Sequence, residues 1–357
     1  MSQFATLGDA MILTYLRSSS IGTYAMCPQK YLFTYVLGMK DKDNGKAIMG
    51  STMHKNLELL GKQKIAQQNK KRSFVDEEFG KINFSKCSIE YFNDLSHAYY
   101  EKLFPGIMPK NSKKITLDWT HLAITKMDGE MNPLNQNVHA VEEFFEVEVP
   151  HEWANYSYKV GDEVIEGRLG LKGTVDLILK EDDVFFHIVD YKSGRRYNWA
   201  TEKVKTYDCL AEDKQLLLYY YALRLKYPDK HFYISIYYTN DYTIDKVFVP
   251  GGVFTFAFDD KDFKKAELMI REQFEAIRDD KFPRVVSKTC NHFKCKHLCA
   301  FSQIIPEISP DVPACIFIRS EIERIGLDAV TAKYADLKRM KVYSGGGRNE
   351  VNLEPKD

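Results

Sequence analysis

The sequence predicts an α/β protein in which a mixed β-sheet is flanked by helices. Apolar and polar residues alternate through much of 138–192, with the period expected for strands of a half-buried sheet. A helical stretch at 212–227 follows, and two further strands are expected at 231–239 and 244–250 before a long helix at 261–279. The predicted order is therefore helices, three strands, a helix, two strands and a helix. This order indicates a sheet with helices packed on it.

The chain before the predicted sheet is expected to be mainly helical. Residues 1–19 form an N-terminal extension, and apolar residues then recur at helical spacing from residue 20 to Gly38 and over 49–68. Five cations between Lys62 and Arg72 are interpreted as a solvated face. Residues 105–137, which contain Pro105, Pro109 and Pro133, are interpreted as an insertion or a long loop.

The composition is typical of a globular protein. With 357 residues, 44% of them hydrophobic, the chain can bury a large core. Its 50 Lys and Arg residues balance 50 Asp and Glu residues, which excludes a histone-like polycation but leaves room for a local nucleic-acid-binding patch. The stretch "GKAIMGST" lacks the lysine of a phosphate-binding loop, so a built-in ATP-driven motor is not expected.

The sequence also predicts where the protein resides. It contains no run of about 18 apolar residues that could span a membrane, and its N-terminus lacks the cationic lead of a signal peptide. We therefore expect a cytoplasmic protein with no membrane partner, in which the seven cysteines stay reduced. A phage-encoded protein would suit the small size and the missing motor.

An acidic hairpin is the first candidate site. The strands at 168–180 and 183–192 are joined by a short turn, which brings Asp176 opposite Asp190 to within about two positions. Two carboxylates this close repel each other unless one is protonated or a cation such as Mg²⁺ lies between them. Lys192 shares the face of Asp190, where its charge could act on a phosphate. A structural ion pair at a strand end is the alternative.

Three features elsewhere in the sequence add to this hairpin. Gly173 would let a nucleic-acid backbone approach the strand closely. Gln215 and Tyr219 are four residues apart on the next predicted helix, so an amide and a phenol share a face from which they could contact DNA. His54 lies on an early helix, where a histidine is by itself more often a core or surface residue than a metal ligand.

Together these residues resemble the RecB-like branch of the PD-(D/E)XK nuclease superfamily, which includes the Cas4 and AddB nuclease domains. The family pattern consists of a Gly-x-x-x-His helix, a Gly-x-x-Asp strand, an acid-x-Lys strand and a Gln-x-x-x-Tyr helix. Each motif is weak alone, and their order carries the resemblance over residues 20–300. In this chain the motifs are Gly50 to His54, Gly173 to Asp176, Asp190 to Lys192 and Gln215 to Tyr219.

The resemblance implies a restriction-endonuclease-like core with helices on both faces of the sheet. We accordingly expect a helical part at 20–137, a nuclease core at 138–280 and a cluster segment at 281–300. Residues 301–357 are expected to form a C-terminal helix and a flexible tail.

The resemblance also implies roles for single residues. Lys192 would act on the attacking water or the scissile phosphate, while Gln215 and Tyr219 would position the DNA strand. The implied ligands of Mg²⁺ or Mn²⁺ are His54, Asp176, Asp190 and the main-chain carbonyl of Tyr191.

Three clustered cysteines form a second candidate site. Cys290, Cys295 and Cys299 lie within "CNHFKCKHLC", a spacing typical of metal ligands in a reduced protein. Zinc needs four ligands, and His292 or His297 could be the fourth. An iron–sulfur cluster accepts a similar set, so this segment alone leaves the choice of metal open.

A fourth cysteine is implied by the resemblance. Cys27, in "CPQKYLFTY", resembles the first cluster ligand of the iron–sulfur RecB-like nucleases, whose other three cysteines lie near the end of the nuclease domain. The family's usual spacing of those three is Cys-x2-Cys-x5-Cys, whereas this chain has Cys-x4-Cys-x3-Cys, and zinc remains the alternative. A [4Fe–4S] cluster with a structural and DNA-clamping role would be held by Cys27, Cys290, Cys295 and Cys299.

The predicted function is metal-dependent cleavage of DNA. The enzyme would be an exonuclease on single-stranded ends in recombination, repair or DNA processing, and a separate helicase or recombination protein could be its partner. Two alternatives stay open: a module that holds DNA ends without cutting them, and an endonuclease of restriction type.

Overall fold

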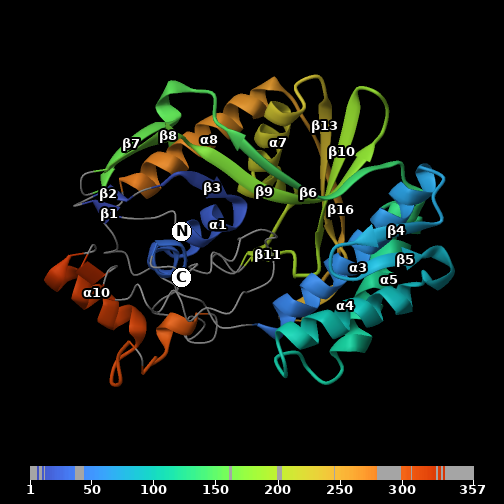
Figure 1. Ribbon diagram of the computed structural model, residues 1–357, viewed down its shortest axis with the longest axis horizontal. Helices are drawn as coiled ribbons and strands as arrows, with labels where there is room; N and C mark the ends of the chain where they lie inside the picture. Colours follow the sequence, from blue (N-terminus) through green and yellow to red (C-terminus); the bar gives the residue numbers. More distant parts are fainter. Residues whose placement is uncertain are drawn as a thin grey trace, which may run out of the picture.

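The structure, a computed structural model, describes residues 6–7, 10–11, 13–36, 44–160, 163–198, 203–244, 246–279, 299–306, 308–326, 329–330 and 333. Its centre is a six-stranded sheet (Figure 1). The strands are β3 (Tyr15–Arg17), β6 (Val138–Glu148), β9 (Gly170–Lys180), β10 (Phe185–Lys192), β13 (His231–Tyr238) and β16 (Gly252–Phe258). They run in the order β16–β13–β10–β9–β3, and β6 also pairs with β9.

The sheet is mixed, and the predicted fold class is confirmed. The pairs β10 with β13 and β3 with β9 are parallel, whereas the other ladders are antiparallel. Because β10 and β13 are parallel, both strands leave the sheet at the same end, which lies opposite the turn between β9 and β10.

Helices lie on both sides of this sheet (Figure 1). The first group comprises α1 (Ser18–Met26), α7 (Lys214–Lys226) and α8 (Asp260–Arg278), and the second comprises α3 (Gly45–Gln68), α4 (Ile89–Leu103) and α5 (Ser112–Thr125). Strand alternation separates the two cores, because Ile188 packs with residues of α7 whereas its neighbour Val189 packs with residues of α3.

The remaining described elements are short. Three are α-helices, namely α2 (Pro28–Tyr31), α6 (Tyr207–Ala211) and α10 (Ala314–Ile325). Short π-helical or 3₁₀ segments are found at Leu32–Val36, Phe84–Lys86, Lys126–Gly129, Pro133–Asn135, Glu152–Ala154 and Ala300–Ser302. The remaining strands form two-stranded hairpins, namely β1–β2 (Thr6–Leu7, Ala10–Met11), β4–β5 (Ser73–Asp76, Gly80–Asn83), β7–β8 (Asn155–Val160, Glu163–Arg168), β11–β12 (Tyr197–Asn198, Lys203–Val204) and β14–β15 (Tyr242–Ile244, Val247–Val249). Of the helices that the structure describes, none has the length and apolarity to cross a bilayer. The domain boundaries stay a prediction.

The first predicted helix, from residue 20 to Gly38, is interrupted. Helix α1 ends at Met26, and Cys27 has an extended backbone with φ −161° and ψ 103°. Pro28 then begins α2, since a proline disfavours helical geometry in the residue before it. The break gives Cys27 a position between two helices instead of inside one.

The interpretation of residues 105–137 as a long loop is wrong, because α5 occupies much of this stretch. The buried face of α5 includes Thr116 and Thr120, which are fully buried, so it shows weak apolar periodicity in the sequence. Their hydroxyls are satisfied inside the protein: Thr116 donates to Asn93 Oδ1 at 2.8 Å and Thr120 donates to the carbonyl of Thr116 at 2.8 Å.

The strand predicted at 244–250 is not part of the main sheet. Its residues form β15, which pairs only with β14 among the described strands. One edge of the sheet is β16, which the sequence prediction missed, and Phe256 there pairs with Ile234 of β13. Gly252, the first residue of β16, has φ +153°, a backbone that favours glycine and lets the chain return to the sheet after the hairpin.

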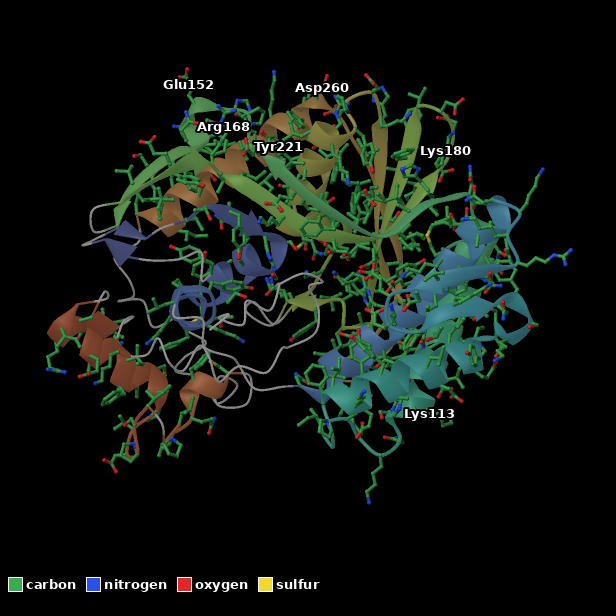
Figure 2. The ribbon with its side chains drawn as sticks, in the orientation of Figure 1. Lys113, Glu152, Arg168, Lys180, Tyr221 and Asp260 are labelled. Carbon is green, nitrogen blue, oxygen red and sulfur yellow. The ribbon has the colours of Figure 1, made fainter. Side chains whose placement is uncertain are left out.

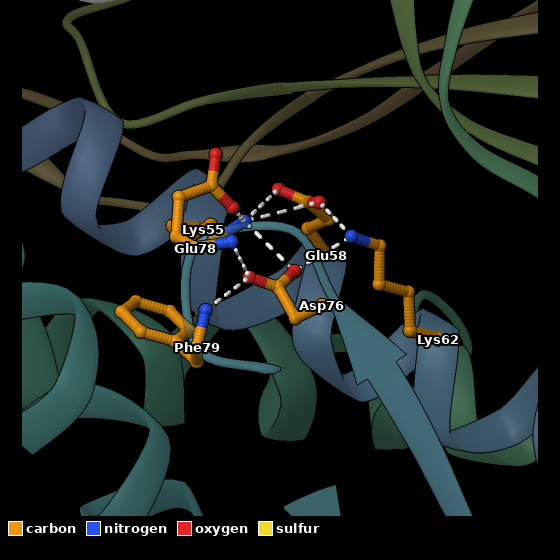
Figure 3. A network of polar contacts seen from close by, with 6 residues as sticks. All are labelled: Lys55, Glu58, Lys62, Asp76, Glu78 and Phe79. Carbon is orange, nitrogen blue, oxygen red and sulfur yellow. Dashed lines mark hydrogen bonds and ion pairs between the residues drawn. The ribbon is translucent and has the colours of Figure 1, made fainter. Parts of the chain in front are cut away.

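The lysines between 62 and 72 do not all lie on a solvated face. Lys62 forms ion pairs with Glu58 at 2.7 Å and Asp76 at 2.6 Å, inside a network that joins α3 to the β4–β5 hairpin (Figure 3). Lys55 is buried at the centre of this network and contacts Glu58, Asp76 and Glu78. Lys64 donates to the carbonyl of Leu134, whereas Lys70, Lys71 and Arg72 are exposed as predicted.

Candidate active site

The predicted catalytic residues meet at one end of the sheet. On the β9–β10 ladder the last pair is Val189 with Leu177, so Asp190 and Asp176 are the next residues on the two strands, as the predicted hairpin requires. Figure 2 labels Lys180, the last residue of β9 before the turn into β10. The site lies at the opposite end of β10 from this turn.

Asp176 is held from two directions. Its Oδ2 accepts a hydrogen bond of 2.7 Å from the main-chain N–H of Tyr191, and its Oδ1 lies 3.3 Å from Nδ1 of His54. Burial alone would raise the pKa of Asp176, but His54 and Lys192 outweigh it and hold that pKa below its usual value. The carboxylate is therefore ionised at neutral pH.

His54 reaches the sheet because α3 approaches it closely at Gly50. A Cβ at Gly50 would lie 2.9 Å from Oγ of Ser193, the residue that follows Lys192. Gly50 and His54 are one helical turn apart and thus share the face directed at the site. Burial would lower the pKa of His54, but the carboxylate of Asp176 outweighs it and raises this pKa to about 9.

Asp190 and Lys192 form an ion pair, with 2.6 Å between Oδ2 and Nζ. Burial raises the pKa of Asp190 to about 6, against the opposing effect of Lys192. Burial also opposes the charge of Lys192, yet Asp190 and Asp176 together raise the pKa of this lysine. Lys192 is therefore an ammonium group, and its side chain is half-buried.

Gln215 connects this pair to α7. Its Nε2 donates to Oδ1 of Asp190 at 3.0 Å and to the hydroxyl of Tyr219 at 2.7 Å, while its Oε1 accepts from Lys192 at 3.2 Å. Asp213 caps the helix by accepting from the N–H of Gln215 at 2.9 Å, which fixes the start of α7. The four residues of the Asp-x-Lys and Gln-x-x-x-Tyr motifs thus form one hydrogen-bonded group.

Tyr219 lies deeper than a DNA-contacting side chain would be expected to lie. Only 5% of the residue is exposed, and its ring packs edge-on against Phe145 at 5.9 Å between centroids. Phe145 in turn covers Gly173, where a Cβ would lie 2.5 Å from the Phe145 ring. A packed aromatic ring, not an approaching nucleic-acid backbone, therefore accounts for the glycine at this position.

Glu142 on β6 is a further site residue that the sequence reasoning missed. Its neighbours Val141 and Glu143 pair with Leu177 and Val175, so Glu142 stands beside Asp176. Ligand atoms of His54, Glu142 and Asp176 all lie within 4.8 Å of one another. Glu142 has a φ of +47°, an unfavourable backbone for this residue type that is often found at functional sites. The acidic strand "HAVEEFFEVEV", set opposite the Asp176 strand, was the available signal.

The donor atoms at this point fit a hard divalent cation. Two carboxylates and one imidazole are suitable ligands for Mn²⁺, and carboxylates also suit Mg²⁺. Asp190 adds a third carboxylate nearby, and its Oδ2 lies 2.6 Å from Nζ of Lys192. The main-chain carbonyl of Tyr191 as a metal ligand stays a prediction.

Two of the four predicted cluster cysteines are described. Cys27 and Cys299 are both half-buried, while Cys290 and Cys295 lie outside the described residues, as do His292 and His297. The segments that follow Cys27 and Cys299 are in contact, because the rings of Phe33 and Phe301 pack at 4.8 Å between centroids.

No curated protein matches the chain in a sequence comparison. Among solved structures, a protein from Eubacterium rectale described as "Putative exonuclease" is similar with a TM-score of 0.43 and 10% identity, over 84% of this chain and 94% of that one. The sequence model of one family matches residues 18–304, which is most of the chain. On this match, the protein belongs to the PD-(D/E)XK nuclease superfamily.

Proposed function

We propose that the protein is a divalent-metal-dependent DNA nuclease that degrades single-stranded DNA from its ends. The observation that carries this proposal is the meeting of His54, Glu142 and Asp176 beside the Asp190–Lys192 ion pair. A cation site next to a half-buried ammonium group is suited to a phosphodiester, since both can stabilise the charge that develops on phosphate during hydrolysis.

The protein residues have separable roles in this proposal. His54, Glu142 and Asp176 would hold Mg²⁺ or Mn²⁺, with Asp190 beside them. The ion would supply charge neutralisation at the phosphate and a lower pKa for bound water. Water adds to phosphorus and loses a proton to solvent, the bond to one ester oxygen breaks, and that oxygen takes a proton from solvent as it leaves. Lys192 would hold the water or the phosphate in place through its ammonium protons.

Gln215 and Tyr219 support this arrangement from α7. The amide of Gln215 contacts both partners of the Asp190–Lys192 pair, so it sets the direction of each side chain. Tyr219 fixes the amide from behind. In this proposal the two residues position the strand indirectly, by holding the groups that contact its phosphate.

The proposal is tested with labelled DNA. Wild type is incubated with 5′-labelled and 3′-labelled single strands in Mg²⁺, Mn²⁺ or EDTA, beside a circular single strand of the same sequence. We expect metal-dependent, stepwise shortening of linear strands and little cleavage of the circle. Cleavage of the circle at comparable rates would favour a restriction-type endonuclease. Binding without cleavage in either metal would favour a DNA-end-binding module.

We further propose that Cys27, Cys290, Cys295 and Cys299 hold a [4Fe–4S] cluster that connects the two ends of the nuclease domain. Support comes from the contact of Phe33 with Phe301 and from Gln29, which donates to the carbonyl of Cys315 at 2.5 Å. Anaerobically purified protein should contain iron and sulfide and absorb near 400 nm. Stoichiometric zinc without sulfide would assign the site to the alternative metal.

The cellular role follows from the proposed activity. Degradation of single-stranded ends serves recombination, repair or DNA processing, and a separate helicase or recombination protein would supply the strand. We expect such a partner to raise the rate on duplex substrates while leaving the rate on single strands unchanged.

A further inference from the structure

Two short hairpins lie directly beyond the candidate site. The β11–β12 hairpin follows β10, and the β14–β15 hairpin follows β13. Because β10 and β13 are parallel, both hairpins begin at the same end of the sheet. In Figure 1, β11 lies below the sheet near the centre of the molecule. The carbonyl of Ser193, next to Lys192, accepts from the hydroxyl of Tyr242 at 2.6 Å and from Nδ2 of Asn240 at 3.0 Å. The β14–β15 hairpin is therefore fixed to the site.

The segment that carries the first hairpin, residues 192–205, is basic. Between residues 192 and 205 the sequence has five cations and a single acid, in a chain whose formal net charge is zero. Some of these cations hold the hairpin: Arg196 donates to the carbonyl of Lys205 at 2.7 Å, and the Lys205 side chain lies 3.3 Å from Asp213. Lys203 is exposed. The surface beside the site thus favours a polyanion over an acidic or neutral partner.

The second hairpin exposes apolar side chains. Phe248 is 64% exposed and Val247 is 60% exposed, and Phe248 is the most exposed large aromatic ring in the part of the chain that the structure describes. Alternation explains the direction of Phe248: Tyr242 and Val249 form a pair that faces the protein, so Phe248 and its partner Thr243 face solvent. A single exposed phenylalanine is common. Phe248, however, lies on a hairpin that is anchored beside the proposed nuclease site and next to a basic segment. This position suggests that its ring binds a ligand.

We propose that the β14–β15 hairpin binds the unpaired bases of the substrate strand, with Phe248 stacking on one base of the part that extends beyond the site. Stacking on an aromatic ring tolerates any base, which suits an enzyme that degrades DNA without regard to sequence. The exposed Lys203 would contact the backbone of the same strand, and the net positive charge of residues 192–205 would attract it. This inference rests on the proposed nuclease function and adds to it a reason for preferring unpaired DNA, since a base inside a duplex cannot stack on Phe248.

The test separates stacking from cleavage. Binding of single-stranded DNA is measured by fluorescence anisotropy with the Asp190→Ala background, in which no cleavage is expected. Added to this background, Phe248→Ala should weaken binding about 10-fold, and Phe248→Trp should restore it. Val75→Ala is the matched control, because Val75 is 72% exposed on the separate β4–β5 hairpin and should not matter.

Strands with one abasic nucleotide at successive positions identify the stacked base. With an intact Phe248, one position should bind distinctly more weakly than the rest, and this minimum should disappear in Phe248→Ala. Identical abasic profiles in the two proteins, or equal affinities, would overturn the proposal even if the protein cleaves DNA. If the abasic profile depends on Phe248 but the wild-type protein never cleaves DNA, the stacking proposal would stand and the nuclease proposal would be wrong. If DNA affinity is unchanged but stimulation by a helicase is lost, the hairpin binds a protein instead.

Discussion

His54 on α3 and Asp176 on β9 lie 3.3 Å apart, measured from Nδ1 to Oδ1. The two residues belong to different layers of the fold, and this contact joins the helical layer to the end of the sheet that carries the candidate site. Without metal, the histidine carries a proton that the carboxylate stabilises. With metal, both would be ligands and the proton would have to leave.

We therefore expect the affinity for Mn²⁺ to rise with pH. Because Asp176 raises the pKa of His54 to about 9, the imidazole is protonated at neutral pH and becomes available only as the pH increases. The Kd should fall by about 10-fold for each pH unit between about pH 7 and 9. Calorimetry in buffers of different ionisation enthalpy measures both the Kd and the released proton. The pH dependence should vanish in His54→Ala, and a flat profile in wild type would contradict this assignment.

Glu142 should show opposite effects on stability and activity. Its φ of +47° is strained for a residue with a Cβ atom, whereas glycine adopts such a backbone without strain. Glu142→Gly should raise the free energy of unfolding of the metal-free protein by about 1 kcal/mol while weakening metal binding and cleavage. Glu146→Gln, on the same strand but paired with Lys172, is the control and should retain activity. Thermal unfolding and metal titration measure the two effects, and a fully active Glu142→Gly would exclude Glu142 from the site.

Gln215 should affect the chemical step more than DNA binding. Gln215→Ala removes hydrogen bonds to both Asp190 and Lys192, each a bond to an ionised group that contributes on the order of 1.5–3 kcal/mol. We expect kcat to fall at least about 10-fold with KM for DNA little changed. Gln67→Ala, at an exposed position of α3, should match wild type. A raised KM with unchanged kcat would instead mean that Gln215 contacts the DNA directly.

The buried network in Figure 3 should matter for stability because it holds unlike charges away from water. Lys55→Met would leave Glu58, Asp76 and Glu78 with less compensation, at a cost of about 3–5 kcal/mol. Lys114→Met removes an exposed pair with Asp118 and should cost under about 1 kcal/mol. Urea unfolding gives both values, and equal small effects would show that the network is not a main connection between α3 and the β4–β5 hairpin.

The sequence was sufficient for the part of the site that depends on regular strands and helices. Period-two alternation and a short turn predict that Asp176, Asp190 and Lys192 lie together. Helical spacing puts Gln215 and Tyr219 on one face, and the resemblance to the RecB-like nucleases implies that this face belongs to the site. The structure brings all five together through one ladder and one helix.

The sequence was insufficient where irregular backbone or buried polar groups decide the structure. Glu142 has a left-handed backbone on a strand with a register shift between Val138 and Ala140, which simple alternation does not anticipate. The helix α5 was missed because threonines fill positions on its buried face. Lys62 was assigned to solvent because nothing local in the sequence indicates that Asp76 lies beside it.

The central claim is that this site hydrolyses DNA with a divalent metal. The most direct measurement compares wild type with Asp176→Asn on labelled single-stranded DNA in Mn²⁺ and in EDTA, with circular dichroism as a check on folding. The account predicts products with wild type in Mn²⁺ only, and a folded variant whose rate is lower by about 100-fold or more. Equal cleavage by the two proteins, or cleavage by wild type in EDTA, would contradict it.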